Sequence, residues 1–222
     1  MTRQVAAGER FLSAGNYAKG YQILDNIGEN NPASAEAALK VADTYFVHHA
    51  YLRAKAHYKN AIARGNRTAG ELGLGRVMLA TNEAVLAEQQ FLTILNVRPQ
   101  SAEALNGLGV ALDLQGRHQE AQHQYTKLLE SLPTDRNGNN NLAVSYILAG
   151  RQGEASNHLG ELARSYLDDP VIRQNLAMAQ VLTGDRYAAE KTFALDMSRT
   201  EAMHNVRTLE QLSRRGVLTA VR

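Results

Sequence analysis

The 222-residue chain has no cysteine and no tryptophan, only four prolines, and a formal net charge of +2. Without cysteine it can form neither disulfides nor thiolate metal sites, and thiol catalysis is excluded. The near balance of charge gives no electrostatic case for nucleic-acid binding. No apolar run approaches the ~18 residues that a membrane-spanning helix needs. The chain is 44% hydrophobic and rich in alanine and leucine, which favours helices around a buried core.

One phrase recurs in the chain at a fixed interval of 34 residues. Residues 107–116 read GLGVALDLQG, residues 141–150 read NLAVSYILAG and residues 175–184 read NLAMAQVLTG. A fixed period of this length indicates a repeat architecture. The offset falls to 33 once, which places a one-residue deletion near residues 63–68. Six units then start near residues 1, 35, 68, 102, 136 and 170.

Several columns of the repeat have a clear physical meaning. Apolar residues at i, i+3, i+4 and i+7 predict two amphipathic helices per unit. A glycine suits the left-handed residue after the first helix, and a proline ends the second helix. Small residues let helix backbones approach closely, and a bulky residue fills the gap between neighbours. The columns are Gly116, Gly150 and Gly184 at the turn, Gly8, Ala42, Gly75, Gly109, Ala143 and Ala177 as small residues, Leu24, Tyr58, Phe91, Tyr125, Leu159 and Phe193 as bulky residues, and Pro32, Pro99 and Pro133 at unit ends.

A 34-residue helix–turn–helix unit with these columns resembles the tetratricopeptide repeat (TPR), over essentially the whole chain. The sequence therefore predicts an all-α fold, a single TPR superhelical domain over residues 1–222. The units must stack, because no helix pair can bury its apolar face alone. The resemblance implies a right-handed solenoid with a concave groove lined by the first helix of each unit.

The end of the chain departs from the repeat. Asp196 replaces the small or apolar residue expected late in the sixth unit, and Ser198 with Glu201 forms an S-x-x-E capping box. Gly216 is a good helix stop. We therefore predict a final capping helix over residues 199–215. Its apolar stripe consists of Met203, Val206, Leu209 and Leu212.

This ending also resembles a particular family of TPR proteins. Residues 175–212 are similar to the close of TadD-type proteins of the tight-adherence (Tad) pilus, with the pattern A-x-x-N-x-x-x-L matched by Ala202, Asn205 and Leu209. The resemblance implies an outer-membrane lipoprotein that faces the periplasm and acts as a pilotin-like partner of the pilus secretin. It also requires a signal and a lipid-bearing cysteine upstream of Met1. If Met1 is the natural start, we expect a cytoplasmic protein.

The repeat register predicts a binding groove in the C-terminal half. A row of carboxamides runs beside an apolar strip on the first helices, and amides offer both donors and acceptors to the backbone of a bound protein segment. The alternative is that asparagine is simply usual in this column, or caps a helix start after TDRNGN. The predicted groove residues are Asn106, Asn140, Asn141, Val144, Ile147, Leu148, Gln174, Asn175, Met178 and Val181.

Other kinds of site have weaker support in the sequence. Asn141 and Asn175 match the asparagine pair of TPR carboxylate clamps, but the basic partners of such clamps do not match, which argues against a clamp. His48, His49 and His57 form the densest histidine group, without a metal-ligand spacing. Asp25 with Glu29, and Asp168 with Asp169, are better explained as solvated helix ends than as acid–base pairs.

We therefore predict a non-enzymatic scaffold without cofactor or metal. Its partner is a protein or peptide segment in the groove, by resemblance the Tad secretin. A generic TPR adaptor or chaperone for another multiprotein complex is the alternative. No nucleic-acid partner is expected, and a membrane is reached only through a lipid anchor.

Overall fold

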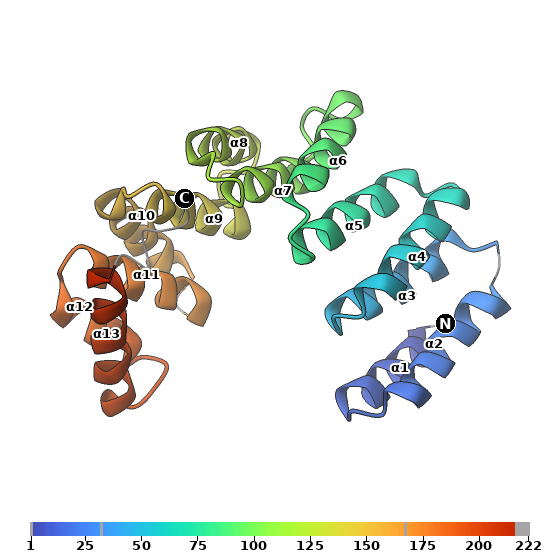
Figure 1. Ribbon diagram of the computed structural model, residues 1–222, viewed down its shortest axis with the longest axis horizontal. Helices are drawn as coiled ribbons and strands as arrows, with labels where there is room; N and C mark the ends of the chain where they lie inside the picture. Colours follow the sequence, from blue (N-terminus) through green and yellow to red (C-terminus); the bar gives the residue numbers. More distant parts are fainter. Residues whose placement is uncertain (1, 32, 167, 216–222) are drawn as a thin grey trace. The chain divides into compact units, whose positions relative to one another are not determined.

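The computed structural model describes residues 2–31, 33–166 and 168–215. These residues form thirteen helices and no strand, which confirms the all-α prediction (Figure 1). None of these helices is long and apolar enough to cross a membrane. The helices are α1 (Thr2–Ser13), α2 (Tyr17–Asn30), α3 (Ala35–Val47), α4 (Tyr51–Ala63), α5 (Arg67–Ala80), α6 (Ala84–Val97), α7 (Ala102–Asp113), α8 (His118–Ser131), α9 (Arg136–Leu148), α10 (Gln152–Ser165), α11 (Pro170–Leu182), α12 (Arg186–Phe193) and α13 (Arg199–Arg214).

The chain forms two compact units, Met1–Gly107 and Leu108–Arg222, with the boundary inside α7. In the first unit α1 pairs with α2, α3 with α4 and α5 with α6, and α4 also packs on α5. In the second unit α8 to α12 pack in sequence and α13 covers α11 and α12. The first helices begin within one or two residues of the predicted unit starts.

The single 33-residue offset has a simple structural cause. Three residues, 64–66, connect α4 to α5, whereas four residues, 98–101, connect α6 to α7. The deletion therefore falls in a loop between units and leaves the helices in register. Its predicted position near residues 63–68 is confirmed.

The small and bulky columns pack against each other. A Cβ atom on Gly75 would lie 2.6 Å from the ring of Phe91, and one on Gly107 would lie 2.3 Å from it. Phe91 is 1% exposed. In the second unit a Cβ atom on Gly109 would lie 2.4 Å from the Tyr125 ring. Real Cβ atoms do not approach so closely, so glycine is required where these rings lie.

The turns between paired helices follow the predicted backbone geometry. Gly116, Gly150 and Gly184 have φ values of 74°, 76° and 85°, in the left-handed region. His49 takes the same place in its unit with φ 59°, and histidine is among the residues that tolerate this conformation. Pro99 and Pro133 lie two residues beyond the ends of α6 and α8, as predicted. Pro32 lies outside the described residues.

The capping helix α13 ends one residue earlier than predicted. Both hydrogen bonds of the Ser198–Glu201 capping box are present, and Ala202 and Val206 are fully buried against α11 and α12. Asp196 accepts a hydrogen bond from Nε of Arg173 on α11 at 2.9 Å. The polar residue that breaks the repeat therefore pairs with α11. Gly216, the predicted stop, lies outside the described residues.

We expect Gly75→Ala to lower the free energy of unfolding by about 1–3 kcal/mol, because the added methyl overpacks the contact with Phe91. Gly160→Ala is the matched control. Gly160 lies in α10 and a Cβ there meets nothing within 4 Å. This change should raise stability by about 0.5–1 kcal/mol. Urea unfolding followed by circular dichroism measures both, and equal effects would contradict the close packing.

Candidate binding surface of the second unit

A cavity of about 290 Å³ opens between the first helices of the second unit. Ligand pockets for small molecules usually measure ~300–1,000 Å³, so this one suits a side chain or a short segment. Its wall is mostly apolar, with one carboxamide, one carboxyl and one phenol. It is lined by Val110 and Asp113 from α7, Leu114 in the turn after α7, Tyr125 from α8, and Asn141, Val144 and Leu148 from α9.

The cavity lies beside a ring that lacks one of the glycine contacts seen in the first unit. In the first unit, the rings of Tyr58 and Phe91 lie over Gly73 and Gly107, in the repeat column that Asn141 occupies. A side chain at that position leaves no room for a ring. Tyr125 instead packs on Gly109, and the space between its ring and Asn141 stays open.

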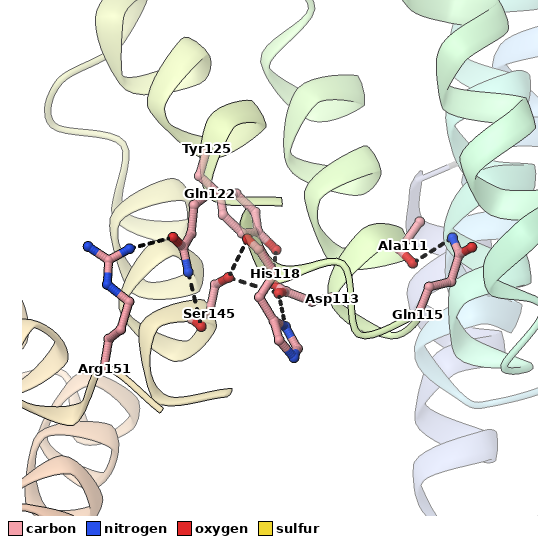
Figure 2. A network of polar contacts seen from close by, with 8 residues as sticks. All are labelled: Ala111, Asp113, Gln115, His118, Gln122, Tyr125, Ser145 and Arg151. Atoms are coloured by element: carbon pink, nitrogen blue, oxygen red, sulfur yellow. Dashed lines mark hydrogen bonds and ion pairs between the residues drawn. The ribbon is translucent and has the colours of Figure 1, made fainter. Parts of the chain in front are cut away.

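Asp113 anchors a buried polar network at the wall of this cavity (Figure 2). Its carboxyl is 7% exposed and accepts hydrogen bonds from Ser145 Oγ at 2.8 Å and Tyr125 Oη at 3.0 Å. His118 Nδ1 lies 2.8 Å from Asp113 Oδ1. Burial raises the pKa of Asp113, and the three hydrogen-bonding partners oppose that shift.

The network extends to α10 and holds three helices together. Gln122 on α8 donates to the carbonyl of Ser145 at 3.3 Å, and Arg151 donates to Gln122 Oε1 at 2.8 Å. The Arg151 guanidinium also lies 4.6 Å from the centroid of the Tyr146 ring. Because each of these groups has a partner, the cavity has a rigid polar base.

The cluster of serine, histidine and aspartate is not a nucleophile site. Ser145 is fully buried, and its hydroxyl is hydrogen-bonded to the Asp113 carboxyl. An activated serine would instead give its proton to a histidine ring nitrogen and would face a substrate. This geometry supports packing and not acyl transfer.

The carboxamide row is partly paired within itself. Asn175 Nδ2 donates to Asn140 Oδ1 at 2.9 Å, which links α11 to α9. Asn140, Asn141 and Asn175 are half-buried and Gln174 is exposed. These residues do not cap helices, because Asp135 and Asp169 are the N-caps of α9 and α11. The capping alternative is therefore wrong.

The apolar strip differs from the prediction at two positions. Ile147 is 5% exposed and Val181 is 7% exposed, and both lie in the hydrophobic core. They are wrong as groove residues. Successive residues on a helix point ~100° apart, so Ile147 faces the core while Leu148 lines the cavity. Val144 also lines it.

The remaining predicted groove residues lie at the edge of this surface or apart from it. Met178 packs, half-buried, against the core of α9, α10 and α11. Asn106 belongs to the first unit, where it is half-buried on α7. Sequence reasoning missed Asp113 and gave Tyr125 only a packing role. The only signal for them is an acidic residue late in an otherwise apolar first helix.

Several of the predicted histidine and carboxylate residues have structural partners. His49 Nδ1 lies 2.8 Å from Tyr51 Oη, and His57 Nε2 lies 3.8 Å from Asp25 Oδ1. Asp169 caps α11 and pairs with Arg136. Over the described ranges, no three histidine or carboxylate side chains are placed to hold a metal ion.

Paired helices with small-on-bulky contacts and left-handed turns define a TPR-like helical repeat fold. No protein-family model matches the chain, and no significant relative was found among curated proteins. Solved structures do share the fold.

Three of these structures match most of both chains. PilW, a widely conserved type IV pilus biogenesis factor, has a TM-score of 0.75 at 15% identity, covering 93% of this chain and 97% of its own. A thermophilic TPR protein of Thermus thermophilus has a TM-score of 0.67 at 20% identity, covering 81% and 98%. A TPR protein of Parabacteroides merdae has 0.64 at 14%, covering 96% and 98%. At these identities the likeness is one of fold.

We expect Asp113→Ala to lower the free energy of unfolding by about 3 kcal/mol, because the buried hydroxyls of Tyr125 and Ser145 lose their acceptor. The control is Asp43→Ala in the first unit. Asp43 accepts a similar bond from Tyr58 at 2.6 Å, but its side chain is 52% exposed. Water can replace it there, so the loss should stay below about 1 kcal/mol. Equal losses in urea unfolding would contradict a network that depends on burial.

His158 on α10 makes stability depend on pH. Its Nε2 atom is buried without a partner. Burial lowers its pKa from the ordinary 6.5, while the Asn139 backbone and Glu161 oppose that shift. The unfolded chain therefore takes up the proton first, so stability is lost as pH falls from 6.5 through the folded pKa. His158→Gln should flatten this slope, and the exposed His123→Gln should not. An unchanged slope in His158→Gln would overturn the assignment.

Proposed function

We propose that this protein is a non-enzymatic scaffold that holds a segment of a partner protein on the first helices of its second unit. The observation that carries the proposal is the cavity lined by Asn141, Val144 and Leu148. It is concave and mostly apolar, with few polar groups, as binding sites usually are.

The chemistry of the cavity suggests how a segment would be recognised. An apolar side chain of the partner would fill the space between Val144, Leu148 and the Tyr125 ring. The Asn141 carboxamide places a polar group at the wall, and an amide can make several hydrogen bonds at once. This combination fits an amphipathic helix or an extended peptide. The Asp113 network keeps the base rigid, which lowers the ordering cost of binding.

We further propose that the partner is the Tad pilus secretin, with a pilotin-like role at the periplasmic face of the outer membrane. Support comes from the resemblance of residues 175–212 to TadD-type proteins. In the structure, Ala202 of that pattern is buried and Asn205 donates to Met197 Sδ at 3.2 Å. PilW, a pilus biogenesis factor, has a similar fold, so a fold of this kind is compatible with a role in pilus biogenesis. The anchor in this proposal is a lipid on a segment upstream of Met1.

We expect Asn141→Ala with Asn175→Ala to weaken binding of the purified secretin by about 5- to 150-fold. Asn141 lines the cavity, and Asn175 belongs to the carboxamide row beside it through its hydrogen bond to Asn140. Two lost hydrogen bonds correspond to about 1–3 kcal/mol. Isothermal titration calorimetry measures the affinity, and circular dichroism confirms that the helices remain. Asn137→Ala is the control, since Asn137 is exposed on the same helix and does not line the cavity.

The outcomes separate the two levels of the proposal. Unchanged affinity in a folded double variant would overturn the binding surface. If the secretin does not bind at all, the Tad assignment fails. In that case, peptides would be selected from a random library for binding to the wild-type protein. Loss of their affinity for the Val144→Asp variant would identify an adaptor for another complex.

A further inference from the structure

Helix α6 exposes one side that carries no charged residue. Its exposed positions span ~140° of the helix at ~100° per residue, so they form one continuous stripe. Four of them are aliphatic, with exposed fractions of 57% for Val85, 47% for Leu86, 43% for Leu92 and 80% for Val97. We call this stripe the α6 face; it consists of Val85, Leu86, Gln89, Leu92, Thr93, Asn96 and Val97.

The repeat itself does not require this composition. The core side of α6 is supplied by Ala87, Phe91 and Ile94. In α8 the same seven positions, 34 residues later, are also exposed but polar or charged. These residues are Gln119, Glu120, His123, Thr126, Lys127, Glu130 and Ser131. The α6 face is therefore an exception to a pattern that leaves the second helix hydrophilic.

The other second helices follow α8 in carrying charge on this side. At the corresponding positions α4 has Arg53 and Lys59, and α10 has Glu154 and Arg164, all exposed. Scattered exposed aliphatic residues are ordinary on a protein surface. Four exposed aliphatic residues on the uncharged side of one helix, where the corresponding helices carry charge, favour an interaction surface instead.

We propose that the α6 face binds a second copy of this chain, related by a two-fold axis. A two-fold interface sets one patch against itself, so a charged stripe such as that of α8 would oppose like charges. The α6 face has none to oppose. Its polar members are self-complementary, because the amides of Gln89 and Asn96 each carry donors and an acceptor. A charged partner would find no opposite charge here.

One helix face is a small interface, and this sets the expected affinity. Stable complexes bury ~800 Å² on each partner, which is more than one stripe of seven residues provides. We therefore expect a reversible, concentration-dependent dimer with a dissociation constant no tighter than about 1 μM.

Sedimentation velocity from micromolar to millimolar protein tests the proposal, which does not rest on the proposed function. The wild-type chain should shift from monomer to dimer as concentration rises. Leu92→Lys should abolish the shift by placing two like charges together across the axis. Thr126→Lys, the same position in α8, should leave it intact. A wild-type chain that stays monomeric, or a dimer unaffected by Leu92→Lys, overturns the proposal.

The absence of cysteine from the chain permits a second readout. In an antiparallel pair the middle of α6 lies near the axis, so Gln89→Cys or Leu92→Cys should give a disulfide-linked dimer on mild oxidation. Thr126→Cys should not. Equal cross-linking at all three positions would indicate random collision, and would overturn the α6 interface.

Discussion

The close approach of a glycine backbone to a large buried ring is the contact on which the repeats depend. Phe91 lies against both Gly75 on α5 and Gly107 on α7. One ring therefore fixes the spacing of its own helix pair and of the helix that follows. Helices of this length would be marginal alone, so their stability comes from such packing.

The same contact explains why the cavity of the second unit lies where it does. Where the column holds Asn141 in place of glycine, the ring of Tyr125 keeps to its own glycine, Gly109. Its hydroxyl then needs a buried acceptor, and Asp113 supplies it at 3.0 Å. The carboxylate is costly to bury and is retained through its three partners. A departure from the packing rule thus creates both an opening and a rigid wall beside it.

The outer sides of the second helices are under a weaker constraint. Packing fixes Ala87 and Phe91 on α6 but leaves Val85 or Leu92 free to vary. The amino-acid composition of that side therefore reflects solubility or binding partners and not the fold. An uncharged α6 face among charged second helices stands out for this reason. It does not include any residue that lines the cavity.

Local features of the sequence were enough to predict the helices, turns and ends. The periodicity of apolar residues fixed where Ala35, Ala102 and Arg136 begin helices, and the left-handed turn at Gly150 follows from the backbone freedom of one residue. The capping box at Ser198 is equally local. These features depend on residues within about two helical turns or on the 34-residue period, so no knowledge of packing is needed.

Contacts between side chains far apart in the chain were not predictable in this way. Ile147 and Leu148 are adjacent and both apolar, yet only the orientation of α9 assigns one to the core and the other to the cavity. Asp113 and Ser145 are brought together across two helix pairs. Such pairings depend on which side-chain rotamers fit among several helices at once, and only the packed structure decides those rotamers.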